Sequence, residues 1–216
     1  MTLFAWILSL FKKAKPKTQP APAPEAPKPA PAPAPAPKPT PAPAPKIRPN
    51  EELVKEAAKW LHVREKGGNN KGPEVEKFQK AVDNRAMGEA WCMSFVQFCV
   101  KEVKTRLNLT ETLFDSEHCQ TVWAKSPKTM RVDPVDVKPG DVIIWRRGET
   151  SNGHTGIVER VVKNDQGQLK EVHTIEGNTG DASFRDGDGV FRRNRHPIAN
   201  GSMKVTGFLR VFPDEV

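Results

Sequence analysis

Three residues that together could carry out nucleophilic catalysis follow one another along the chain. Cys92 comes after a turn of small residues that begins at Gly88, and it opens an apolar stretch that continues to Val103. His154 lies in a glycine-flanked sequence, Gly-His-Thr-Gly, and Glu176 follows Thr174-Ile175, two residues typical of a strand. A cysteine, a histidine and a carboxylate in this order can supply a nucleophile, a base and a group that orients the base.

The position of Cys92 favours a reactive thiol. The apolar spacing from Cys92 onward follows a helical period, so the cysteine lies in the first turn of a helix. A helix N-terminus has unpaired N–H groups and a partial positive charge, and both stabilise a thiolate. Taken alone, however, Cys92 is also in phase with the apolar stripe, and a free cysteine there is commonly a buried structural residue. Cys99, seven residues later, has that structural interpretation.

A strand-rich second half is expected to position the histidine and the acid. The polar turn 164–167, Asn-Asp-Gln-Gly, predicts a hairpin that brings His154 and Glu176 to the same edge of two neighbouring strands. Helices followed by strands indicate an α+β fold, with N-terminal helices packed on a C-terminal antiparallel β-sheet. The strands are expected at 141–145, 156–162, 170–176, 189–193 and 204–211.

Two helices are expected before the cysteine helix. The first starts with Asn50 as N-cap, has acidic residues in its first turn, and is stopped by Gly67-Gly68. The second starts with Pro73 at its first position and ends near Asp83-Asn84. Between residues 104 and 138 the pattern is mixed, and short helices and loops are expected there.

The prolines divide the chain into three parts. Residues 1–15 are a short apolar and basic segment, residues 16–46 a Pro/Ala/Lys-rich linker, and residues 47–216 a domain. The apolar run 3–11 is about half as long as a membrane-spanning helix. With the lysines that follow, it can lie at an anionic membrane surface as an anchor, although an uncleaved export segment is an equal alternative.

The net charge of +8 does not indicate nucleic-acid binding. Eight basic residues and one acidic residue lie before residue 49, so the domain itself is close to neutral. The basic stretch has no aromatic residue that could stack on a base, and the domain has no basic stripe. We therefore expect no nucleic-acid partner.

The other candidate ligand residues favour structural roles. The neighbours His118 and Cys119 have no second pair at zinc-ligand spacing, which argues against a metal site. The turn at 186–189, Asp-Gly-Asp-Gly, lacks the later bidentate acid of a calcium loop. Three cysteines fit one reactive thiol better than a disulfide framework, but the sequence leaves open whether Cys99 and Cys119 pair.

Several motifs together resemble the CHAP family of cysteine hydrolases and amidases, within the NlpC/P60 group of papain-like cell-wall enzymes. The resemblance covers roughly Ile47 to Val216 and rests on four short matches: Trp91-Cys92, Pro139-Gly-Asp-Val142, Gly153-His-Thr-Gly-Ile-Val158 and Glu176-Gly-Asn178. It implies a papain-like fold and an active site of Cys92, His154, Glu176 and Asn178. Calcium-binding members have an aspartate-rich loop ahead of the cysteine, where this chain has the Gly/Asn/Lys sequence 67–72. No metal or other cofactor is therefore expected.

The resemblance also implies a substrate and a location. The expected function is a peptidoglycan hydrolase, an amidase or an endopeptidase, that cleaves amide bonds of the wall peptide through a cysteine thioester. It would act as a monomer at the cell envelope, as a bacterial or phage-encoded lysin, with its N-terminal segment at an anionic membrane surface. The sequence leaves open which peptidoglycan bond is cleaved. The alternative is a membrane-tethered module that binds wall or protein without catalysis.

Overall fold

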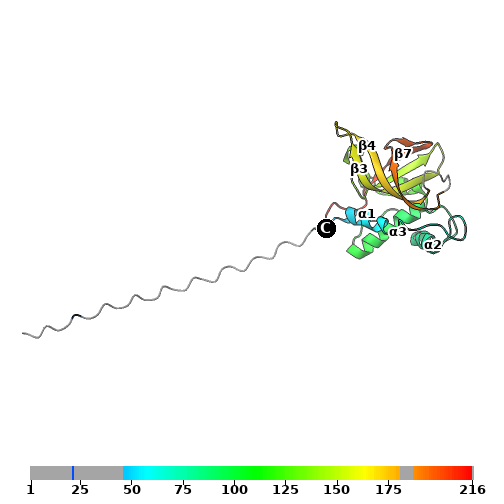
Figure 1. The fold of residues 1–216 in the computed structure, drawn as a ribbon, viewed down its shortest axis with the longest axis horizontal. Coiled ribbons are helices and arrows are strands. Elements are labelled where there is room, and N and C mark those ends of the chain that lie inside the picture. Colours follow the sequence, from blue (N-terminus) through cyan, green and yellow to red (C-terminus); the bar gives the residue numbers. More distant parts are fainter. Residues whose placement is uncertain (1–20, 22–45, 181–186, 216) are drawn as a thin grey trace, which may run out of the picture. The chain divides into compact units, whose positions relative to one another are not determined.

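The computed structural model describes residues 46–180 and 187–215, together with Ala21. The chain divides into two units, Met1–Pro43 and Ala44–Val216, and the second contains all the helices and strands below (Figure 1). Apart from Ala21 and Lys46, the expected segments 1–15 and 16–46 lie outside the described residues. Within the described residues, no helix has the length and apolar character needed to cross a membrane.

The helices come first in the chain, as predicted, but one predicted cap is wrong. Asn50 lies inside the first helix and caps nothing; its side-chain amide donates to the Phe212 carbonyl at 3.0 Å. The helix instead begins at Pro49 and ends at Ala58, well before Gly67-Gly68. The four helices are α1 Pro49–Ala58, α2 Pro73–Asp83, α3 Cys92–Leu107 and α4 Cys119–Lys125, followed by the 3₁₀ turns η1 Lys128–Met130 and η2 Pro134–Asp136.

The second half forms one seven-stranded antiparallel sheet. Its order is β1-β7-β2-β3-β4-β5, and β6 pairs with β7. The predicted turn at 164–167 joins β3 to β4, where Asn164 N–H donates to the Gln168 carbonyl at 2.9 Å and Gly167 has a positive φ. The strands are β1 Arg131–Val132, β2 Val142–Arg147, β3 Gly153–Lys163, β4 Leu169–Thr179, β5 Gly189–Arg195, β6 Ala199–Asn200 and β7 Met203–Leu209.

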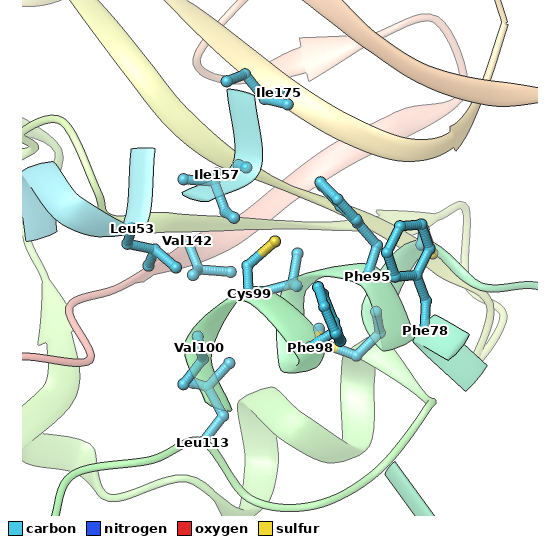
Figure 2. Close-up of a cluster of buried hydrophobic side chains, with 14 of the residues drawn as sticks. Leu53, Phe78, Phe95, Phe98, Cys99, Val100, Leu113, Val142, Ile157 and Ile175 are labelled. Atoms are coloured by element: carbon cyan, nitrogen blue, oxygen red, sulfur yellow. The ribbon is translucent and has the colours of Figure 1, made fainter. Parts of the chain in front are cut away.

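The main core lies between α3 and the sheet. Ten of the sixteen residues of α3 are buried, so this helix faces protein on almost every side. Figure 2 shows Cys99 and Val100 of α3 with Val142, Ile157 and Ile175, which come from three neighbouring strands. Close packing of this kind fixes the position of α3, and therefore of its first residue, relative to β3 and β4. The α+β prediction, with helices on an antiparallel sheet, is confirmed.

Candidate active site

Cys92 is the first residue of α3. Trp91 is the N-cap, and its carbonyl accepts from the Phe95 N–H at 2.9 Å, so the helix starts tightly at the cysteine. The Cys92 side chain is almost fully buried, with 7% of the residue exposed, and lies at the wall of a pocket that Glu89, Glu117 and Arg147 also line. Helix start and partial access together are the setting in which a thiol becomes reactive.

The histidine and the acid are brought together by the β3–β4 hairpin, as predicted. His154 Nε2 and Glu176 Oε2 are 2.8 Å apart, on the neighbouring strands β3 and β4. The imidazole also stacks on Trp145 of β2, with ring centroids 5.7 Å apart and an interplanar angle of 22°. With Nε2 held by the carboxylate and the ring held by the indole, Nδ1 is the nitrogen that remains for the Cys92 thiol.

The glycines beside His154 have a steric explanation. A Cβ at Gly156 would lie 2.6 Å from Cγ of Glu176, and a Cβ at Gly153 would lie 2.4 Å from the Trp145 carbonyl oxygen. Real side chains essentially never approach so closely. The side chain of Glu176 and the backbone of Trp145 can therefore lie against β3 only because these two positions carry no side chain.

Glu176 has a second charged partner that the sequence did not reveal. Arg195, on β5, donates from Nε to Glu176 Oε1 at 2.8 Å and from Nη2 to Oε2 at 2.5 Å. Thr174 Oγ1 donates to Oε1 at 2.6 Å. Together with His154, these groups occupy both oxygens of a carboxylate that is completely buried. The only sequence signal for Arg195 is a basic residue on the strand after Glu176, which is too common to identify a partner.

The electrostatics of the four groups favour an ion pair at the thiol. Burial acts to raise the pKa of Glu176, but Arg195 and His154 outweigh it and lower the pKa to about 2. Burial acts to lower the pKa of His154, but Cys92 and Glu176 outweigh it and raise the pKa to about 9. The Cys119 thiol lowers the pKa of Cys92 well below its usual value, burial opposes this, and His154 lowers it further. These shifts favour a thiolate, an imidazolium and a carboxylate as the charge states of the three groups.

Asn178 lies at a different place from the other three predicted residues. Its backbone is left-handed, with φ of 50°, a conformation that asparagine tolerates better than most residues. With its amide oxygen toward the helix start, Asn178 accepts from the Trp91 N–H at 3.0 Å and donates to the Gly187 carbonyl at 3.1 Å. These contacts tie the end of β4 to the start of α3. Its part in catalysis stays a prediction.

Cys119 is the other residue near the thiol that the sequence did not place there. Its Sγ lies 3.9 Å from Sγ of Cys92, and no pattern in the sequence links two cysteines 27 residues apart on different helices. All three cysteines are free thiols, and Cys99 is fully buried within α3.

The buried ion pair of Arg195 and Glu176 predicts a large stability effect. Arg195→Met leaves a buried carboxylate without its main counter-charge, and we expect a loss of about 3–5 kcal/mol in the free energy of unfolding, measured with urea. The matched control is Arg192→Met on the same strand. Its side chain is 56% exposed and pairs with Glu159, so we expect a loss of about 0–1 kcal/mol. Equal losses in the two variants would contradict the assignment.

The pH dependence of this effect follows from the pKa of Glu176. The folded value of about 2 is below the ordinary 4.5, so the stability that the ionised carboxylate contributes is complete above about pH 4.5. It is lost as the pH falls from there toward 2. The gap between wild type and Arg195→Met is expected to narrow over the same range.

The thiolate at Cys92 is tested by its rate of alkylation. Iodoacetamide modifies thiolates, so modification of Cys92, followed by mass spectrometry, should persist at pH values below the ordinary thiol pKa of 9.0. In His154→Ala the midpoint of that pH dependence should move toward 9. Cys99 is an internal control, because burial raises its pKa and it should stay unmodified in the folded protein. An unchanged midpoint in His154→Ala would show that His154 does not activate the thiol.

Comparison with known families agrees with the motifs and the geometry. Residues 84–178 match the model of the CHAP domain, a range that includes Cys92, His154, Glu176 and Asn178 and ends before β5 and Arg195. Neither a curated protein nor a solved structure gives a significant match to the chain. CHAP domains are in general hydrolases of the amidase or peptidase type. Residues 84–178 thus match a CHAP domain, and the helices packed on an antiparallel sheet are consistent with a CHAP-type, papain-like fold.

Proposed function

We propose that the protein is a cysteine-dependent peptidoglycan hydrolase, which cleaves amide bonds of the wall peptide through a thioester. The observation that carries the proposal is the continuous array from Cys92 through His154 and Glu176 to Arg195. It starts at a thiol beside an open pocket and ends at a charge that keeps the acid ionised. The CHAP family match supports peptidoglycan as the substrate.

The first half of the reaction forms the thioester. The Cys92 thiolate attacks the carbonyl carbon of the scissile amide, and the oxygen takes the negative charge. The Cys92 N–H, unpaired at the start of α3, is one donor that can stabilise this oxygen. As the C–N bond breaks, the imidazolium of His154 gives its Nδ1 proton to the leaving amine. Throughout, Glu176 holds Nε2 and thereby fixes the orientation of the ring.

The second half removes the acyl group. His154, now neutral, takes a proton from a water molecule that attacks the thioester carbon, and the thiolate of Cys92 leaves. The raised pKa of His154 and the lowered pKa of Cys92 restore the ion pair at the end of each cycle.

The pocket beside Cys92 suits a substrate that carries charges. Two carboxylates, Glu89 and Glu117, line it together with the guanidinium of Arg147. Burial and the nearby Glu89 raise the pKa of Glu117 to about 7. Wall peptides contain both free carboxylates and amines, and both could find a counter-charge here. The pocket does not by itself distinguish an amidase from an endopeptidase.

Digestion of purified peptidoglycan, with mass spectrometry of the fragments, tests the activity and identifies the bond. Wild type should release fragments, and Cys92→Ser should be slower by more than about 10³-fold, because an alcohol is a poor nucleophile in a site built for a thiolate. Cys99→Ser, altered in the core of the same helix, is the control and should release the same fragments as wild type. Whole stem peptides free of glycan would show an amidase, whereas cut stems or bridges would show an endopeptidase.

If folded wild type and Cys92→Ser both bind peptidoglycan but release no fragments, the protein is a binding module without catalysis. The Cys92→Ser variant must be shown to be folded, for example by the cooperativity of its urea unfolding, before its result counts.

We also propose that the N-terminal segment holds the enzyme at an anionic membrane surface of the cell envelope. The support is its sequence: a short apolar run that contains Trp6, followed by four lysines within six residues. Aromatic residues enter the headgroup region and lysines face anionic lipid, but a single short segment of this kind gives reversible attachment only.

Lysine substitutions in the full chain test this attachment. Changing the four lysines at 12, 13, 15 and 17 to glutamine should weaken binding to phosphatidylglycerol-containing vesicles by about tenfold or more. The difference should shrink as salt is added. The control changes four exposed lysines of the domain, at 125, 128, 170 and 204, and should bind like wild type. Equal binding by all three proteins would contradict the proposal.

A further inference from the structure

A second thiol lies beside the nucleophile, and the proposed reaction does not use it. Cys119 is 4% exposed and its Sγ is 3.9 Å from Sγ of Cys92. Both cysteines line the same pocket, so a small solute that reaches one thiol also reaches the other. The pKa of Cys92 is lowered and that of Cys119 is raised, which favours the Cys119 S–H as the donor of the hydrogen bond between the two sulfur atoms.

The packing of α4 fixes Cys119 in this place. Gln120, the next residue, donates from Nε2 to the Trp145 carbonyl at 3.0 Å and connects α4 to β2. On the other side, Gly153 of β3 approaches so closely that a Cβ there would lie 3.1 Å from Cβ of Cys119. Gly153 is the residue before His154 in β3. Because it has no side chain, Cys119 can lie next to the start of this strand. The contacts of α4 with β2 and β3 therefore hold the Cys119 thiol beside the Cys92 thiol.

We propose that Cys92 and Cys119 are a peroxide-reactive thiol pair, in which Cys119 converts oxidised Cys92 into a reversible disulfide. The inference rests on the proposed function in one respect only, that Cys92 is the nucleophile whose activity is switched. The oxidant is a hydroperoxide, hydrogen peroxide being the simplest. The pair stops the enzyme under oxidation and protects the nucleophile from overoxidation.

The chemistry balances in two steps. In the first, the Cys92 thiolate attacks one peroxide oxygen; an S–O bond forms, the O–O bond breaks, and the second oxygen leaves as hydroxide and takes up a proton to become water. Cys92 loses two electrons and the peroxide gains them. In the second step, the Cys119 sulfur attacks the sulfenic sulfur of Cys92. An S–S bond forms, the S–O bond breaks, and the hydroxyl leaves as water with the thiol proton of Cys119.

The geometry requires little movement. A disulfide has an S–S distance of about 2.05 Å, so the two sulfur atoms must approach by about 2 Å. A change in side-chain torsion at either cysteine, with a small shift of the short helix α4, can supply this. Without Cys119, a sulfenic acid at Cys92 has no protein thiol within reach in the pocket, and excess peroxide can oxidise it further to the sulfinic acid, which thiols do not reduce.

Cys99 cannot take the place of Cys119 in the thiol pair, although it is closer to Cys92 in the sequence. It lies on the same helix as Cys92, but it is fully buried, and burial raises its pKa well above the usual value. It therefore offers neither access nor a thiolate, and it serves as the internal control.

The test uses the full-length protein, treated with a small excess of hydrogen peroxide and then divided in two, one half receiving dithiothreitol. In wild type we expect the loss of two of the three thiols per molecule and a Cys92–Cys119 cross-linked peptide by mass spectrometry. Wall-digesting activity should be lost and then recovered with dithiothreitol. Cys99→Ser should behave in the same way, with the loss of both its remaining thiols.

The variant Cys119→Ser should instead accumulate sulfinic acid at Cys92, and dithiothreitol should not recover its activity; each variant is compared with its own activity before oxidation. If Cys119→Ser does not fold, the cross-link in wild type still decides the matter. A peroxide-treated wild type without the cross-linked peptide overturns the proposal, as does full recovery of Cys119→Ser. Cross-linking needs no substrate, so a protein that forms the cross-link under peroxide but does not digest peptidoglycan in its reduced state would refute the proposed function and leave the thiol pair standing.

Discussion

The site depends on one buried charge, the carboxylate of Glu176. A lone carboxylate in a completely buried position would be protonated, because moving its charge out of water costs several kcal/mol. Two donors from Arg195, one from Thr174 and one from His154 compensate that cost and occupy both oxygens. These contacts lower the pKa of the acid to about 2, so it stays ionised near neutral pH. An ionised acid, in turn, allows His154 to remain an imidazolium beside the thiolate.

This charge also explains local features of the fold that look unrelated to it. The side chain of Glu176 lies over β3 where Gly156 leaves room, and Gly153 leaves room for the backbone carbonyl of Trp145, whose indole stacks on His154. On the other side, Gly177 faces Phe95 and Trp91 of the helix start, where a Cβ would be 2.6 Å from Cβ of Phe95. The helix and the sheet thus meet through glycines at the site. The same close contacts that position the three reacting side chains forbid most substitutions there.

The sequence could predict what local patterns determine. The helix start at Cys92, the turn at 164–167 and the meeting of His154 with Glu176 follow from apolar period and turn chemistry, and the structure has all three. The N-cap at Asn50 was wrong because its side chain bonds to the C-terminal segment, 162 residues away. Arg195 and Cys119 could not be predicted for the same reason. Their partners are set by strand order and helix packing, which no short pattern in one sequence encodes.

The family match covers only part of the site. The match ends at residue 178, so it includes the cysteine, the histidine and the acid but not β5, which supplies the guanidinium that the acid requires. An ionised carboxylate that is buried without a counter-charge is destabilising, so an acid at this position needs a positively charged partner. In this chain the partner is Arg195 on β5, the strand that pairs with β4 and lies beyond the matched residues. The matched segment therefore contains the reacting groups, whereas Arg195, which keeps the acid ionised, lies outside it on β5.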